Sequence, residues 1–207
     1  MEELINKLKI ELKKTLPGIE VQYEMAPLSR PRVDVKTLEK SQYQLSAVLI
    51  VFCLDEDGNV FIPLIERGVY NGLHSGQIGF PGGKFETSDE NLQNTAIREC
   101  YEEIGLGSGI EIIGKLTSLF IPVSSFLVEP YVGVCKNKGP LMIPHEQEVK
   151  NVLKLFLNNL MNINTIELGE LEVDGNKIKT PYFLVEGYKV WGATAMILNE
   201  LKTILER

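Results

Sequence analysis

The 207-residue sequence has few residues of several kinds, and each shortage excludes a class of protein. It has three cysteines and no CxxC spacing, which argues against a zinc site or a disulfide framework and is typical of a reducing compartment. Basic residues number 21 against 28 acidic ones, and the formal net charge of -7 gives no electrostatic reason to expect a nucleic-acid partner.

Long apolar runs are also missing. The first residues, MEELINKLKIELKKTL, carry charges throughout and lack the apolar segment of a signal peptide. No run approaches the roughly 18 apolar residues that a membrane span requires. We therefore expect a soluble, cytoplasmic protein with no membrane segment. Its length and its hydrophobic content of 44% suit one globular domain with extensions.

Strand-like and helix-like patterns are mixed along the chain and indicate an α/β or α+β fold. Apolar residues at helical spacing predict a helix over 2–16, and the polar, proline-bearing stretch at 25–34 is typical of an extended arm. We divide the chain into an N-terminal helix and arm, residues 1–40, and a main domain, residues 41–207.

The main domain shows a hairpin, a loop and a series of further elements. LSAVLIVFCL at 45–54 predicts a buried strand, which an Asp-Gly turn joins to a return strand ending at Arg67. A glycine-rich loop follows over 68–83. The other expected elements are a helix over about 90–104, strands near 111–121 and 127–135, a loop that becomes a helix over 146–162, a hairpin over 173–187 turned at Asp174-Gly175, and a helix over about 191–206.

The helix expected over 90–104 crowds like charges on one face. Glu99, Glu102 and Glu103 stand at i, i+3 and i+4, on what we expect to be an exposed or half-exposed surface. Such carboxylates repel each other by roughly a few tenths of a kcal/mol even when exposed. A hard divalent cation would offset the repulsion, and Arg98 can orient a carboxylate beside them. A solvated acidic face is the alternative.

A double glycine lies just before this helix. Phe80-Pro81-Gly82-Gly83 offers a backbone that side chains do not obstruct, so phosphate oxygens can approach its N–H groups. By itself, however, a double glycine usually marks only a tight turn.

The stretch resembles the Nudix box, which runs Gly, five residues, Glu, seven residues, Arg-Glu, an aliphatic residue, any residue, Glu-Glu, any residue, Gly and an aliphatic residue. RECYEEIGL at 98–106 matches its second half, with Cys100 at the aliphatic position as a packing residue.

The first half of the box departs from the pattern. Six residues, not five, separate Gly83 from Glu90. The role of Glu90 is therefore open, and Glu86 or Asp89 can substitute for it.

Upstream, PLIERGVYNGLHSGQIGFPGGK at 63–84 is similar to the extra signature of the coenzyme A pyrophosphatase branch of the Nudix superfamily. One signature position that often holds a second arginine holds Gly72 here. The residues that match the signature, and that the resemblance implies for substrate binding, are Arg67, His74, Gly76, Gln77, Phe80, Gly82 and Gly83.

The resemblance implies a Nudix α/β/α sandwich, with a mixed sheet between helices, that hydrolyses a pyrophosphate bond in a nucleoside diphosphate derivative. It makes Glu99, Glu102 and Glu103 the ligands of Mg²⁺ or Mn²⁺, and Glu99, Arg98 and Glu103 the catalytic set. The metal would neutralise phosphate oxygens and lower the pKa of a bound water. The general base can be one of these carboxylates or come from a later loop, where the candidates are Glu146 and Glu148.

The signature favours coenzyme A or an acyl-CoA, a small-molecule substrate that would be cleaved to 3′,5′-ADP and 4′-phosphopantetheine or its acylated form. Arg67, Lys84 and the basic arm at 30–32 are the candidate charges for the extra phosphate. Plain alternatives exist at other positions: a loop-shaping hydrogen bond for His74 and a core anchor, not a base-stacking residue, for Trp191.

Alternative functions remain at this stage. ADP-ribose, dinucleoside polyphosphates and nucleoside triphosphates are the other candidate substrates, and a Nudix-fold binding or regulatory protein is the other class. All four charged residues of the second half of the box are present, which favours an enzyme. The oligomeric state is open, with a homodimer as one candidate.

Overall fold

An eight-stranded mixed sheet forms the centre of the computed structural model, which describes residues 1–68, 76–162, 167–173 and 175–207. Its long central strand β1 runs parallel to β7 and antiparallel to β2 and β4. The strand order is β3-β2-β1-β7-β5, while β4 pairs with β1, β6 with β7 and β8 with β2. The strands are β1 (Gln44–Leu54), β2 (Val60–Arg67), β3 (Ile78–Gly79), β4 (Gly82–Lys84), β5 (Ile110–Lys115), β6 (Leu119–Ile121), β7 (Phe126–Lys138) and β8 (Val149–Phe156).

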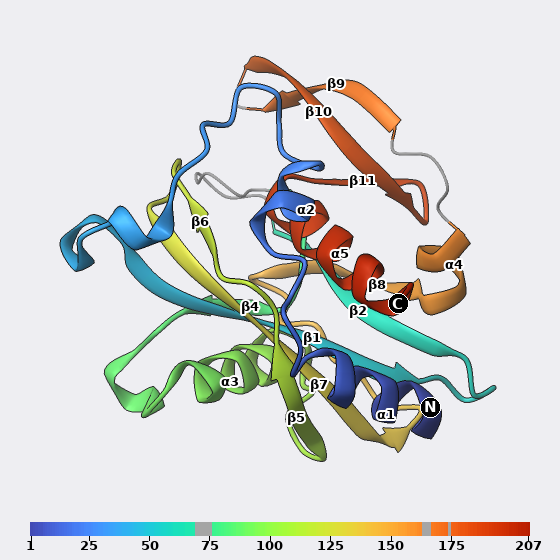
Figure 1. Ribbon diagram of the computed structural model, residues 1–207. Helices are drawn as coiled ribbons and strands as arrows, with labels where there is room; N and C mark the ends of the chain where they lie inside the picture. The colour runs from blue at the N-terminus through green and yellow to red at the C-terminus, as the bar shows by residue number, and fades with distance from the viewer. Residues whose placement is uncertain (69–75, 163–166, 174) are drawn as a thin grey trace.

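Helices cover both faces of this sheet (Figure 1). Helix α3 (Leu92–Ile104) lies on one face, and α1 (Glu2–Glu11), α2 (Ile19–Tyr23) and α5 (Gly192–Leu205) lie on the other. The arrangement confirms the predicted α/β/α sandwich with a mixed sheet.

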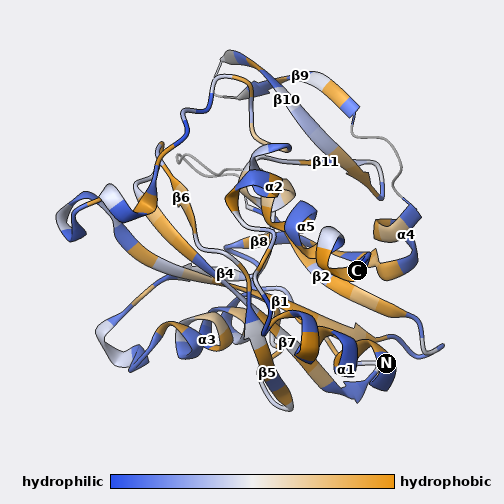
Figure 2. Ribbon diagram, viewed as in Figure 1, coloured by the Kyte–Doolittle hydropathy of each residue, from blue (hydrophilic) through white to orange (hydrophobic). Residues whose placement is uncertain are grey.

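The sequence of β1 explains how one strand serves two cores. Side chains alternate along a strand, so Leu49 and Val51 pack towards α3 while Ile50 and Phe52 pack towards α5. Figure 2 shows the resulting concentration of apolar residues on the central strands. Cys100 of α3 is fully buried in the first of these cores, and burial raises the pKa of its thiol, which agrees with a packing role.

A second sheet lies over the α5 side and packs against that helix. It consists of β9 (Glu167–Val173), β10 (Asn176–Val185) and β11 (Tyr188–Trp191), all antiparallel. Phe183 and Val190 bring it into the same apolar core as α5. Among the described residues, no helix is both long enough and apolar enough to span a membrane.

The prediction of a loop that becomes a helix over 146–162 is wrong for its middle part, residues 149–156. Residues Val149–Phe156 form β8, and only Leu157–Asn162 are helical, as α4. Leu153 and Leu155 belong to the core on the α5 side, whereas Val152 packs against the core on the α3 side. A run that is apolar on both faces does not favour one helical stripe, and pairing with β2 satisfies the backbone groups of both strands.

Other expected boundaries also shift. The N-terminal helix ends at Glu11, and the short α2 precedes the arm at 25–34. The strand expected at 111–121 is two strands, β5 and β6. The expected hairpin turns between β9 and β10, so its first strand lies upstream of residue 173; Asp174 lies outside the described residues.

A buried carboxylate ties the N-terminal segment to α5. Glu200 accepts hydrogen bonds from the backbone N–H of Gly18 at 3.0 Å and from Nε2 of Gln22 at 2.8 Å. It also accepts from the hydroxyl of Thr117 at 2.6 Å and from the N–H of the same residue at 3.2 Å. Every partner donates, so both oxygens of Glu200 must accept.

We expect Glu200→Gln to lower the free energy of unfolding by about 3 kcal/mol, because the new amide group points N–H at buried donors. Urea unfolding measures the change. The matched control is Glu206→Gln, which removes only a helix-end ion pair with Lys202 and should cost at most about 0.5 kcal/mol. Equal stabilities for the two variants would contradict the assignment of Glu200 as a structural clamp.

Candidate active site

The double glycine forms the short strand β4, which lies between α3 and a pocket on the other side. Gly82 has φ +152°, and a Cβ there would lie 2.4 Å from the carbonyl oxygen of Ala47 and 2.6 Å from Cα of Val48. Only glycine allows β4 to approach β1 this closely. The close approach places the backbone of β4 next to the carboxylates of α3.

Arg98 is the centre of the charged cluster. Its Nε and Nη2 donate to the two oxygens of Asp89 at 2.6 and 2.9 Å. Its Nη1 donates to Glu99 at 2.9 Å and to Glu102 at 2.8 Å. Nη2 also donates to the carbonyl of Lys84 at 3.1 Å, which holds the arginine against β4. One guanidinium therefore offsets three carboxylates.

Asp89, and not Glu90, is the acidic residue before α3 that pairs with Arg98. Asp89 is buried and accepts from the hydroxyl of Thr95 at 2.9 Å, and its bond with Arg98 holds the pKa of its carboxyl well below the usual range. Five residues separate Gly83 from Asp89, as in the box, but eight separate Asp89 from Arg98, where the box has seven. Glu90 is exposed and takes up the extra residue with φ +53°.

Glu103 is buried, with 2% of its surface exposed, so the expectation of an exposed or half-exposed position was wrong for this residue. It accepts from Nη1 of Arg67 at 3.0 Å and from the N–H of Gly82 at 2.8 Å. Burial raises the pKa of Glu103 to about 7, although both partners act in the opposite direction. The helix face could not be placed from its own spacing, because its burial depends on β1 and β4, which pack against it.

Glu99 is half-buried against the second glycine of β4. A Cβ on Gly83 would lie 2.5 Å from both carboxylate oxygens of Glu99, so the absence of a side chain there makes room for this carboxylate. Burial raises the pKa of Glu99, and its bond with Arg98 opposes the rise. Glu102 is the exposed member of the cluster, with 52% of its side chain accessible.

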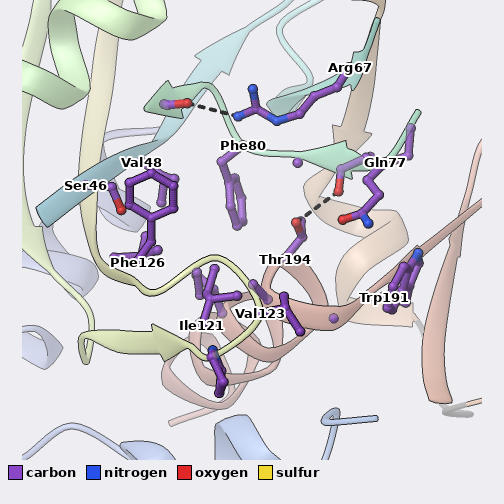
Figure 3. Close-up of a pocket in the computed structure, with 18 of the residues that line it drawn as sticks. Ser46, Val48, Arg67, Gln77, Phe80, Ile121, Val123, Phe126, Trp191 and Thr194 are labelled. Carbon is purple, nitrogen blue, oxygen red and sulfur yellow. Dashed lines mark hydrogen bonds between the residues drawn. The ribbon is translucent and has the colours of Figure 1, made fainter. Parts of the chain in front are cut away.

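A pocket of about 530 Å³ lies on the α5 side of β4. Phe80, Ile121 and Val123 contribute to an apolar wall, and Arg67 enters from β2 and donates to the carbonyl of Gly82 at 2.9 Å (Figure 3). Thr194 of α5 donates to the carbonyl of Ile78 at 2.9 Å, which closes the wall between α5 and β3.

Most of the described signature residues meet at this pocket. It is lined by Arg67, Gln77, Phe80, Gly82 and Gly83. Gly76 is exposed and does not line it, and His74 lies outside the described residues.

The structure also places Trp191 and the two candidate bases, Glu146 and Glu148. Trp191 is half-buried and lines the pocket, so it is not the core anchor that we expected. Glu146 and Glu148 are both exposed in the loop before β8, and the charge of Glu148 contributes to the raised pKa of Glu103. That loop is held near the end of α3 because the N–H of His145 donates to the carbonyl of Glu103 at 2.9 Å.

The N-terminal arm contributes residues that sequence reasoning placed only loosely. Pro27, Arg30 and Pro31 line the pocket together with Lys84. Arg32 does not; it pairs with Glu20 at 2.9 Å on the surface. The basic character of the arm was visible in the sequence, but two arginines two residues apart carry no sign of which one faces inward.

The donor set on α3 has the chemistry that a hard divalent ion requires, since all its candidate ligands are carboxylate oxygens and two of them are poorly hydrated. Within the described ranges, however, no three acidic, histidine or cysteine side chains already converge on one point as a metal site would need. Arg98 binds one oxygen of Glu99 and one of Glu102, and Arg67 binds one oxygen of Glu103.

Comparisons with known proteins agree with this geometry. A family model described as the NUDIX domain matches residues 44–170. A Salmonella dublin protein named uncharacterized Nudix hydrolase NudL is 32% identical over 175 residues, which cover 84% of this chain and 88% of that protein. Nudix hydrolase 15, mitochondrial, from Arabidopsis thaliana is 31% identical over 192 residues, 89% of this chain and 65% of the plant protein. The crystal structure of a MutT protein from Methanosarcina mazei covers 83% of this chain and 99% of its own, with a TM-score of 0.52 and 18% identity, and shows the same fold.

We expect Gly83→Ala to displace the carboxylate of Glu99 and to lower kcat/KM on the order of 100-fold, the scale of a small misplacement in an active site. The unfolding midpoint should change little, because the clash is with the end of a flexible side chain. The matched control is Gly169→Ala on β9, where an added Cβ also meets only a side chain, at 2.9 Å from Cε1 of Tyr182. Gly169 does not line the pocket, and the kcat/KM of this variant should match the wild type. A Gly83→Ala enzyme with wild-type kcat/KM would show that the position of Glu99 does not matter for turnover.

Proposed function

Because the chain belongs to the Nudix family, whose hydrolases cleave pyrophosphate bonds in nucleoside diphosphate derivatives, we propose that it cleaves the pyrophosphate of coenzyme A or an acyl-CoA. The products are 3′,5′-ADP and 4′-phosphopantetheine or its acylated form. The observation that carries this proposal is a pocket that has a largely apolar wall, is lined by two arginines, and is separated from the acidic helix only by β4.

Coenzyme A differs from smaller nucleotide substrates in its partly apolar arm and its extra phosphate. The arm needs an apolar channel, and Ile121, Val123 and Phe126 supply one. Val123 leaves 70% of its surface exposed at this wall, where it can contact an apolar ligand. The arginines suit the phosphates, because a guanidinium forks onto phosphate oxygens.

The acidic helix supplies the metal ligands in this proposal. Glu99, Glu102 and Glu103 would hold Mg²⁺ or Mn²⁺, which would neutralise phosphate oxygens and lower the pKa of a bound water. Arg98, held by Asp89, keeps Glu99 and Glu102 in place until the ligand arrives. The carboxylates of the helix can thus lie close together without the ion and remain available to bind it.

Arg67 and Glu148 complete the proposed machinery. Arg67 stands at the boundary between cluster and pocket, where it contacts both Glu103 and β4 and can meet a phosphate oxygen of a bound pyrophosphate. Glu148 is the preferred candidate for the base that accepts the proton of the attacking water, because its charge acts on Glu103 and its side chain is exposed. Glu146 is the second candidate, in the same exposed loop.

Removal of a metal ligand should impair metal binding and turnover more than it impairs folding. We expect Glu99→Gln and Glu103→Gln to abolish turnover and to weaken Mn²⁺ binding measured by calorimetry. Glu99→Gln should keep its stability, whereas Glu103→Gln should lose about 1–3 kcal/mol, because it places an amide N–H among buried donors. The control is the exposed Glu90→Gln, which should match the wild type. Wild-type Mn²⁺ affinity in both cluster variants would rule out this ligand set.

The substrate is tested by steady-state kinetics with Mg²⁺ or Mn²⁺ on coenzyme A, dephospho-CoA and ADP-ribose. We expect kcat/KM for coenzyme A to exceed that for dephospho-CoA by about tenfold or more, the scale of one charged hydrogen bond of roughly 1.5–3 kcal/mol. Mass analysis of the products should find 3′,5′-ADP. A higher kcat/KM for ADP-ribose than for coenzyme A would reject the coenzyme A assignment and leave a Nudix hydrolase of another nucleotide.

A further inference from the structure

Arg30 is held in the pocket wall by contacts that leave most of its donors free. Its backbone N–H closes a turn onto the carbonyl of Pro27 at 2.9 Å, and the N–H of Leu28 donates to the carbonyl of Lys179 in β10 at 3.1 Å. Its Nη2 donates to the carbonyl of Phe120 in β6 at 2.5 Å. The arm therefore presents this guanidinium to the pocket in a defined position.

The charge of Arg30 has no acidic partner among the residues that the structure describes. The neighbouring ring of Tyr23 lies 5.9 Å from its guanidinium carbon, and Nε is shielded from water without a hydrogen-bond acceptor. Burial lowers the pKa of Arg30, as expected for a cation that has lost water and gained no carboxylate. Nη1 of Arg32, by contrast, donates to both oxygens of Glu20, at 3.0 and 2.9 Å.

Arg30 and Arg67 lie at different ends of the pocket. Arg67 is anchored on Gly82 of β4 and Arg30 on Phe120 of β6. Between them the strands follow the order β4, β1, β7, β6. Three strand spacings separate the two anchors, about 14 Å along the sheet. Because the Nη2 atom of each arginine lies within 2.9 Å of its own anchor, we expect the two guanidinium groups to meet different anionic groups of a ligand.

We propose that Arg30 binds a second anionic group of the substrate, separate from the pyrophosphate that meets the acidic helix. This inference rests on the proposed function, and for coenzyme A the second group is the 3′-phosphate. A phosphate monoester supplies the negative charge that Arg30 lacks and accepts from several N–H groups of one guanidinium. Arg30 is then a specificity residue, which acts on substrate choice and not on the bond that breaks.

The two products of an adenine nucleotide site allow this to be tested without turnover, because 3′,5′-ADP and 5′-AMP differ only in the 3′-phosphate. We expect calorimetry to show that the wild type binds 3′,5′-ADP at least tenfold more tightly than 5′-AMP. Arg30→Gln should remove most of this preference, and Arg30→Lys, which keeps the charge but not the fork, should reduce it at least threefold. The control Arg32→Gln should retain it, because Arg32 does not line the pocket.

Each other outcome overturns the inference. A wild type with no preference lacks the second anion site, and an Arg30→Gln that weakens both ligands equally shows that Arg30 only holds the arm on β6. If Arg30→Gln fails to fold, an unchanged preference in Arg30→Lys is decisive against it.

Turnover answers a separate question. If the protein binds 3′,5′-ADP through Arg30 but does not hydrolyse coenzyme A, the second anion site is supported and the proposed function is rejected. If it hydrolyses coenzyme A and Arg30→Gln leaves the preference for 3′,5′-ADP unchanged, the proposed function is supported and the role of Arg30 is rejected.

Discussion

The two hydrogen bonds that the buried carboxylate of Glu103 accepts, from Arg67 and from the N–H of Gly82, connect the two halves of the site. Glu103 belongs to α3 on one face of the sheet, whereas Arg67 and Gly82 line the pocket on the other. Because a buried carboxylate without donors is costly, each of these groups holds the others in place. The glycine at position 82 is what lets β4 come close enough to take part.

A second arginine, Arg98, lies among the carboxylates of the acidic helix. Arg98 contacts Asp89, Glu99 and Glu102, and its single positive charge reduces the repulsion among them while α3 packs on the sheet. Burial raises the pKa of both Glu99 and Glu103. Two arginines, Arg98 and Arg67, therefore hold the acidic face of α3 in place.

The N-terminal segment forms part of the pocket wall as well as part of the protein surface. Glu200 clamps Gly18 and Gln22 to α5, and the chain that follows α2 then runs along the pocket and delivers Arg30. A residue buried in α5 thus positions a charge on an arm far away in sequence. The apolar wall between Arg30 and Arg67 comes from β6, β7 and α5, so strands and helices from the whole chain meet around one ligand-sized space.

The sequence by itself determined the mixed α/β class, the strand over 45–54, the helix that carries Glu99, Glu102 and Glu103, and the family, because alternation and a spaced charge motif are local patterns. It failed over 149–156, where an apolar run suits helix or strand until β2 offers a pairing edge. Only the tertiary structure decided that Asp89 takes Arg98, that Glu103 is buried, and that Arg30 and not Arg32 lines the pocket. The Asp89–Arg98 pair depends on how the turn before α3 folds back onto the helix, and the other two depend on which distant strands approach the residue. Burial and pairing across a fold leave no periodic trace in the chain.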